Sequence, residues 1–145
     1  MLLSHGTWVL ILDGEKYLLL QNEGDRNALS LRVLQHAEID NPPTRDQGTE
    51  KPGRMPDAGA GRSAVEQTDW HTLEKESFAH DVADRLRRWA LADRFSQIVI
   101  CADPRTLGTI RHNYHAEVSR RIVAELDKDL TGLPIDEMEK VIGAA

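Results

Sequence analysis

Four carboxylates in this sequence are candidates for a two-metal hydrolytic site. Asp13 follows a short apolar run, Asp103 follows a second one, and Glu74 and Glu76 lie on a predicted long helix. Converging carboxylates of this kind hold two divalent cations that activate water and stabilise a leaving oxygen, as in a metal-dependent nuclease. The same residues also have simpler roles, because Asp suits a hairpin turn or a helix N-cap and Glu suits a solvated helix face. The sequence favours the simpler roles and keeps the nuclease as an alternative.

The histidines offer a second possible chemistry. His112 and His115 are three residues apart near a predicted helix end, and Asp69, His71 and Glu74 gather near the start of another helix. Zinc normally takes three or four ligands at defined spacing, which neither group supplies. We therefore expect these histidines to cap helices or face solvent, and we predict no metal and no cofactor.

Two possible nucleophiles also have simple interpretations. Cys101 ends an apolar run with no His or Arg beside it, which is typical of a buried thiol. As the chain's single cysteine, it excludes an internal disulfide framework. Ser63 follows Gly61 and Arg62, but no strand precedes it and the G-x-S-x-G spacing of a nucleophile elbow is missing. The residues therefore predict a binding protein rather than an enzyme, with any catalytic residue unknown.

A glycine- and proline-rich segment is the strongest candidate for binding. Residues 41–61 contain no Ile, Leu, Val or aromatic residue, so they bury too little apolar area to offset the entropy of ordering. We predict a mobile loop over residues 41–68 that contacts a phosphate backbone and becomes ordered on binding. The acids Asp46, Glu50 and Asp57 offset part of its charge. The candidate nucleic-acid-binding residues are Arg45, Lys51, Arg54, Gly59, Gly61 and Arg62.

Composition limits the partners. The 145 residues include 18 basic and 24 acidic side chains, for a net charge of −6, which argues against a generally basic nucleic-acid-binding surface. The apolar start has no basic leader and is interrupted at Asp13, well short of the ~20 residues that span a bilayer. We expect one cytoplasmic domain without membrane insertion.

The pattern of apolar residues predicts strands and helices that alternate after an initial meander. Strands are predicted over residues 7–12, 16–21, 29–39, 95–101 and 118–126, although the last stretch is also compatible with a helix. Helices are predicted over residues 69–92, 104–114 and 134–142, with Asp103 as the N-cap of the second. In the third strand, Leu34 breaks the alternation.

This order predicts an α/β domain with a five-stranded mixed sheet. Three antiparallel strands are followed by βαβ crossovers, and the helices pack on the sheet. The same plan occurs in ribonuclease-H-like domains and in the central domain of class-1 peptide-chain release factors.

Short motifs along nearly the whole chain resemble the bacterial host-attachment protein family, proteins described as required for attachment to host cells. They are Thr7-Trp8-Val9 with Asp13-Gly14, Gly61-Arg62-Ser63, Phe78-Ala79 with Val82-Ala83 and Leu86, Ala102-Asp103-Pro104 with Leu107-Gly108 and Arg111, and residues 125–131 with Pro134. The resemblance implies a relation to the release-factor central domain, and hence structured RNA or the ribosome as partner. A protein partner in cell attachment is the other possibility.

One departure from the release-factor pattern bears on activity. Release factors hydrolyse peptidyl-tRNA with a Gly-Gly-Gln loop, and the equivalent stretch here, residues 53–63, has glycines but no Gln. Gln47 and Gln67 lie outside the glycine cluster. The resemblance therefore implies a non-catalytic binding factor.

Overall fold

The apolar runs after residues 7 and 97 form the two central strands of the sheet. In the computed structural model, which describes residues 1–38 and 64–145, β1 (Trp8–Leu12) and β4 (Ile98–Ala102) are buried along their whole length. They pair in parallel, with Leu10 opposite Ile100. A strand that is covered on both faces needs apolar side chains at every position, and the sequences of β1 and β4 provide them.

The other strands complete the predicted five-stranded mixed sheet, whose order is β3-β2-β1-β4-β5. β2 (Lys16–Asn22) and β3 (Leu31–Glu38) form an antiparallel meander with β1, and β5 (Ile122–Leu126) pairs in parallel with β4. The predicted fold class is therefore confirmed.

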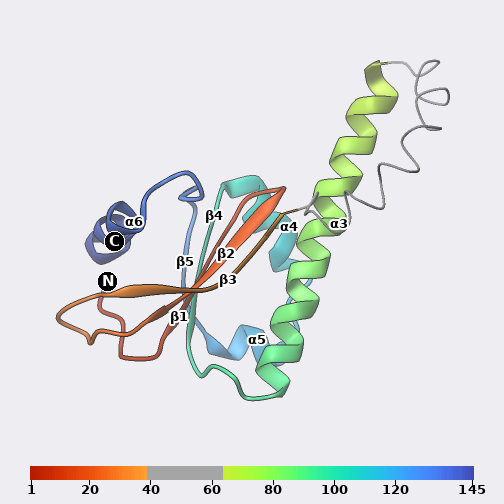
Figure 1. Cartoon of the computed structure of the whole chain (residues 1–145). Coiled ribbons are helices and arrows are strands. Elements are labelled where there is room, and N and C mark those ends of the chain that lie inside the picture. The colour runs from red at the N-terminus through yellow and green to blue at the C-terminus, as the bar shows by residue number, and fades with distance from the viewer. Residues whose placement is uncertain (39–63) are drawn as a thin grey trace.

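Helices cover both faces of the sheet (Figure 1). On one face lie α3 (Ala64–Leu91), α4 (Pro104–Arg111) and α5 (Ala116–Arg121), and on the other lies α6 (Ile135–Ala144). Alternate residues of β1 feed the two cores: Trp8, Leu10 and Leu12 pack toward α3–α5, and Val9 and Ile11 pack toward α6. Among the described residues, no helix is long and apolar enough to cross a membrane.

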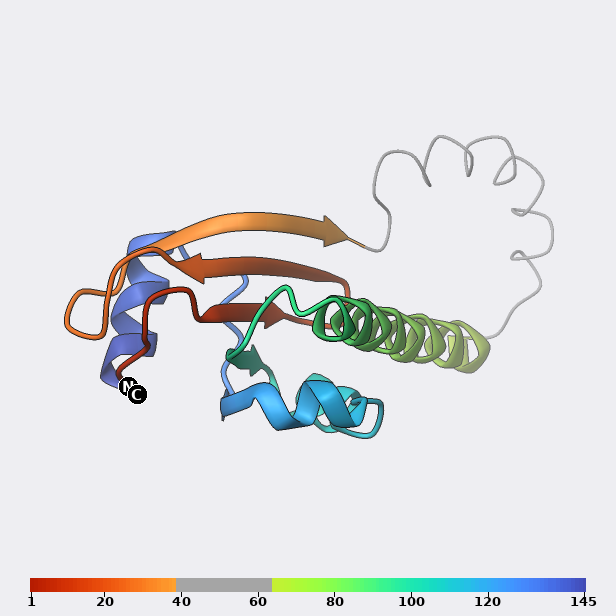
Figure 2. The same ribbon diagram turned by 90° about the horizontal axis from the view of Figure 1, so that it is seen from below.

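The long helix begins earlier than predicted. It starts at Ala64 rather than near residue 69, so the first turns include residues 64–68, which the sequence placed in the loop. These turns extend past the end of the sheet (Figures 1 and 2). Among the α3 residues whose side chains are described, Phe78 is the first in the buried core. Without an apolar stripe in its first turns, this part of the helix could not be recognised from periodicity.

The prediction of a strand over residues 118–126 is wrong for its first four residues. Residues 116–121 form α5, and β5 begins directly at Ile122. The His115 Nδ1 accepts the backbone N–H of Glu117 at 3.0 Å, and the Glu117 carboxylate in turn pairs with Arg120 at 2.8 Å. Side-chain capping and an i,i+3 ion pair stabilise this short helix. Neither interaction can be recognised from the alternation of apolar residues, which is why the sequence predicted a strand here.

The irregular Leu34 marks a β-bulge. Leu19 of β2 lies opposite Gln35 whereas Leu20 lies opposite Val33, so Leu34 has no partner in the register. The extra residue reverses the alternation of β3 along the chain. Bulges also make an edge strand such as β3 a poorer template for pairing with another chain.

Cys101 is buried in β4, as predicted, and its chemistry can be tested. Burial raises the pKa of its thiol to about 12. Because the thiolate is the reactive form, we expect alkylation near pH 8 to be at least ~100-fold slower in the native protein than in denaturant. Mass spectrometry of quenched samples measures both rates. Rapid native labelling with the circular dichroism spectrum unchanged would show that the thiol is accessible.

Candidate functional site at the carboxyl edge of the sheet

The carboxyl ends of the parallel strands β1, β4 and β5 lie at one edge of the sheet. The β1–β2 turn, the start of α4 and the β5–α6 connection all lie at this edge. β3 also ends here, because its last residue, Glu38, pairs with Lys16 at the start of β2. Residues 39–63 therefore leave the described fold at the edge where open α/β sheets usually bind ligands.

Asp13 holds this edge together. Its Oδ1 accepts the backbone N–H groups of Glu15 at 2.7 Å and Lys16 at 2.8 Å, which fixes the hairpin turn. Its Oδ2 lies 3.2 Å from the hydroxyl of Thr131, in the β5–α6 connection. Thr131 also lies 2.5 Å from Asp129, and its single hydroxyl proton serves one carboxylate at a time. Asp13 therefore joins the first hairpin to a segment 118 residues further along the chain.

The α3 helix is tied to the same turn through Lys75. A Cβ atom on Gly14 would lie 2.8 Å from Cδ of Lys75, so the aliphatic stem of the lysine crosses directly over the glycine. Lys75 and Arg105 also line a small hollow between α3 and α4, together with Thr106. The acid Glu76 lines the same hollow, so the two exposed basic groups share it with a carboxylate.

A shallow groove lies on the α6 side of this edge. It has a volume of about 210 Å³ and includes Lys16, Leu18, His36 and Thr131 among its lining residues. Tyr17 also borders the groove, and its hydroxyl donates to Oε1 of Gln35 at 2.7 Å. Burial raises the pKa of Tyr17, opposed by the charge of Arg85, so the phenol stays protonated at neutral pH.

The four carboxylates of the nuclease alternative have separate roles where the structure describes them. Asp103 caps α4 as predicted, since its Oδ2 accepts the backbone N–H of Thr106 at 3.1 Å. Asp13 is engaged in the turn, Glu76 is exposed, and Glu74 is half-buried. Among the residues whose side chains the structure describes, 1–37 and 74–145, no three His, Cys, Asp or Glu side chains lie close enough to hold a metal ion.

The predicted binding residues lie outside the described part of the chain. Arg45, Lys51, Arg54, Gly59, Gly61 and Arg62 all belong to residues 39–63.

The prediction that the histidines cap helices or face solvent is tested at two positions. His115 provides the N-cap of α5, and the exposed His112 is the C-cap residue of α4.

Sequence reasoning missed the basic residues of this edge. Lys75 belongs to α3, and only the fold brings it over the turn that Lys16 follows. Arg105, in α4, lines the hollow between α3 and α4 with Lys75. The contact between Thr131 and Asp13 was also missed. Thr131 belongs to the motif over residues 125–131, but the sequence of that motif does not indicate which residue Thr131 contacts.

The role of Asp13 predicts a difference between two similar turns. Asp25, in the β2–β3 connection, also accepts two backbone N–H groups, at 2.9 Å each, but it is exposed. We expect Asp13→Ala to lower the free energy of unfolding by about 1–2 kcal/mol, and Asp25→Ala by about half as much. Urea denaturation of both variants measures the difference. Equal losses would show that the Thr131 contact contributes nothing.

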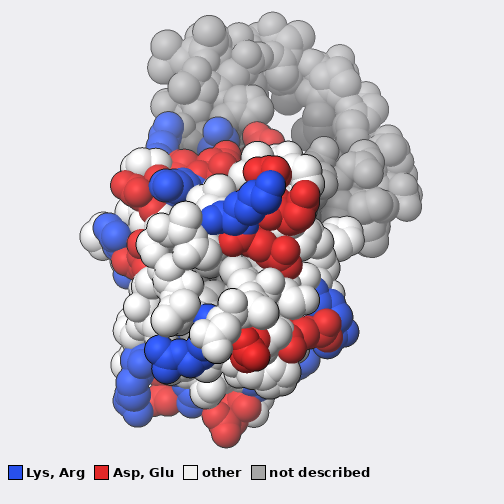
Figure 3. All heavy atoms as spheres, turned by 90° about the vertical axis from the view of Figure 1, so that its left-hand side faces the viewer, with Lys and Arg blue, Asp and Glu red and all other residues white. Residues whose placement is uncertain are grey.

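Charges are mixed on the face that includes α6. Figure 3 shows Lys and Arg side chains scattered among Asp and Glu, with uncharged surface between them. Within α6 itself, Lys140 pairs with Glu137 at 3.4 Å. This face therefore lacks the broad positive field that non-specific nucleic-acid binding needs.

Residues 6–142 match the model of a known family, Bacterial archaeo-eukaryotic release factor family 12. The chain belongs to this family. No curated protein matches it significantly. The expected relation to release factors is thus confirmed, whereas the host-attachment name has no counterpart in the match.

Proposed function

We propose that this protein is a non-catalytic factor that contacts structured RNA, with the ribosome as the leading partner, through residues 39–63 and the carboxyl edge of the sheet. The observation that carries the proposal is the family match over residues 6–142. Fold-level kinship alone does not give a function, so the residues at the site must support it as well.

The segment between β3 and α3 supports the proposal by its position and chemistry. Its place in the chain order is that of the Gly-Gly-Gln loop in release factors, and it combines glycines with Arg45, Lys51, Arg54 and Arg62. Glycines allow close approach of a backbone, and Arg side chains bind phosphate in a bidentate fashion. In release factors the Gln of this loop orients the hydrolytic water, and residues 53–63 contain no Gln. We therefore assign the segment a binding role rather than a hydrolytic one.

The described residues at the edge add to this chemistry. Lys75 is exposed and Lys16 is half-buried beside a turn whose acid, Asp13, is engaged with backbone N–H groups. Arg105 is exposed at the hollow that Lys75 also lines. The exposed acids Glu15 and Glu76 are the sequence neighbours of Lys16 and Lys75, and they weaken the positive electrostatic potential of these lysines. We therefore expect few phosphate contacts, about four, and a salt dependence of log affinity with a slope of roughly −3.

Co-purification from a bacterial lysate tests the proposal. The tagged chain is captured at about 50 mM salt and washed at about 300 mM, and the retained RNA is sequenced. We expect ribosomal RNA at low salt and its release in the wash. Treatment with ribonuclease before capture is the control for protein-mediated retention.

Retention of no nucleic acid at low salt would overturn the proposal. The chain would then be a protein-interaction factor, as an attachment role would require, and its relation to release factors would be one of fold.

A further inference from the structure

A second groove lies away from the carboxyl edge, between α3 and the short α4–α5 connection. It has a volume of about 210 Å³, room for several water molecules. Its lining residues are His80, Ala83, Asp84, Arg87, Asn113 and His115. Two imidazoles and a guanidinium therefore surround one hollow, and none of the three belongs to the carboxyl edge of the sheet.

The hydrogen bonds of Asn113 fix the tautomer of His80. The Asn113 Nδ2 donates to the carbonyl oxygen of Thr109 at 2.9 Å, so Oδ1 is the atom that faces His80. Nδ1 of His80 lies 2.9 Å from this oxygen and must therefore carry a proton. In the neutral ring, Nε2 is then an acceptor.

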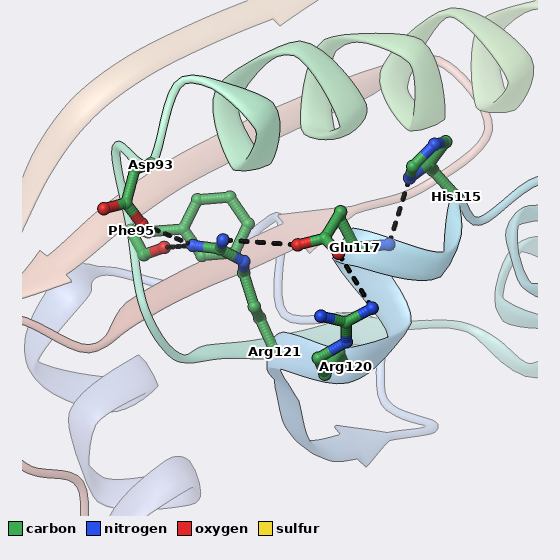
Figure 4. A network of polar contacts seen from close by, with 6 residues as sticks. All are labelled: Asp93, Phe95, His115, Glu117, Arg120 and Arg121. Atoms are coloured by element: carbon green, nitrogen blue, oxygen red, sulfur yellow. Dashed lines mark hydrogen bonds and ion pairs between the residues drawn. The ribbon is translucent and has the colours of Figure 1, made fainter.

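His115 has the opposite tautomer. Its Nδ1 accepts the backbone N–H of Glu117, which can only donate, so Nδ1 carries no proton and Nε2 does. Figure 4 shows the ring raised from the start of α5 toward α3. The groove thus has one imidazole acceptor, on His80, and one imidazole donor, on His115.

Arg87 adds donors that its ion pair leaves available. Its Nε and Nη2 both bond to Oδ1 of Asp84, at 3.1 and 2.8 Å, while Arg88 approaches Oδ2 of the same carboxylate at 3.3 Å. Both oxygens of Asp84 are therefore engaged, and its pKa is lowered, chiefly by the hydrogen bond from Arg87. Three of the five N–H groups of Arg87 are not used in this pair.

We propose that this groove binds a terminal phosphate group, either of a free nucleotide or of an RNA end. Arg87 and the Nε2–H of His115 would donate to phosphate oxygens, and the Nε2 of His80 would accept the proton of a phosphate hydroxyl. A terminal phosphate ester carries this proton in its monoanionic form, whereas a carboxylate, a sulfate and an internal phosphodiester have no such proton. The site is independent of the proposed function, because it uses no residue of the carboxyl edge or of residues 39–63.

Histidine side-chain NMR tests the proposal on the intact chain. The probes are inorganic phosphate, sulfate, AMP, and a short RNA with either a 5′-phosphate or a 5′-hydroxyl. With six histidines, the long-range ¹H–¹⁵N spectrum is simple enough to assign. We expect phosphate to move the Nε2 signals of His80 and His115. Sulfate, which has the same charge as hydrogen phosphate but no proton, should bind about fivefold more weakly.

Three variants separate the groove from the surrounding surface. His80→Ala removes the acceptor, and His115→Asn removes Nε2 while keeping a capping oxygen for α5. Each should weaken phosphate binding roughly tenfold. The matched control is His112→Ala, which changes an exposed histidine that does not line the groove. It should leave the affinity within about twofold.

The outcomes separate the two sources of phosphate. AMP binding as tightly as the phosphorylated RNA assigns the groove to a free nucleotide, and a preference for the phosphorylated RNA over both AMP and the hydroxyl RNA assigns it to an RNA end. Unmoved His80 and His115 signals with every probe would refute the proposal. So would equal binding of sulfate and phosphate, or an equal loss in His112→Ala.

Discussion

Replacing Trp8 by Ala should lower the free energy of unfolding by about 3–5 kcal/mol, the largest stability effect that we expect from a single substitution. Only 4% of Trp8 is exposed. Its ring stacks on Phe95 with centroids 4.8 Å apart and meets Trp89 edge-on at 5.7 Å. The Phe95 ring in turn lies under the guanidinium of Arg121 at 5.8 Å (Figure 4), so removal of Trp8 leaves a cavity against a ring that also supports this arginine.

Trp89 provides the comparison for this prediction. Trp89 is half-buried, whereas Trp8 is buried. We therefore expect Trp89→Ala to lower the free energy of unfolding by about half as much as Trp8→Ala. Leu91→Ala is the surface control, at 54% exposure, and should change stability by less than about 0.5 kcal/mol. Urea denaturation followed by circular dichroism avoids dependence on tryptophan fluorescence. A loss in Trp8→Ala no greater than that in Trp89→Ala would contradict this account of the core.

Replacing Arg54 and Arg62 together by Ala should weaken ribosome binding at least about tenfold at low salt. It should also make the slope of log affinity against log salt shallower by roughly 1.4, because two phosphate contacts no longer release counterions. Thermal stability should stay nearly unchanged, since residues 41–61 contain no Ile, Leu, Val or aromatic residue to contribute to a core.

The matched control removes two arginines at the opposite edge of the sheet. Arg26 lies in the β2–β3 connection and Arg94 lies between α3 and β4, and both are exposed. The Arg26→Ala/Arg94→Ala variant has the same net charge as Arg54→Ala/Arg62→Ala, so a general charge effect would weaken both equally. Such equality in a binding titration would remove residues 39–63 from the proposed interface.

The sheet could be predicted from the sequence because its central strands carry their own signal. The buried runs of β1 and β4, and the Asp103-Pro104 pair that opens α4, are short-range patterns with one physical interpretation. The α5 helix could not be predicted in the same way. Its stability comes from the His115 cap and the Glu117 ion pairs, and Val118 is its one buried residue.

The candidate site could be predicted only in part. Glycines and arginines within one segment are visible in the sequence, and the binding role that they suggest for residues 39–63 stays a prediction. The meeting of Lys75 with Gly14 and of Thr131 with Asp13 joins residues far apart in the chain, and no local pattern encodes such contacts. The tautomers of His80 and His115, in the groove between α3 and the α4–α5 connection, likewise follow from hydrogen bonds that form only in the folded chain.

Ultraviolet cross-linking of the chain to purified ribosomes, with the adducts mapped by mass spectrometry, would locate the RNA contacts of the proposed interface. We expect RNA adducts on peptides that contain residues 39–63, with additional adducts near Lys75 and Arg105, and loss of all of them at high salt. Adducts confined to other parts of the chain would contradict the proposal, and so would the absence of any adduct from ribosomes incubated with the chain at low salt.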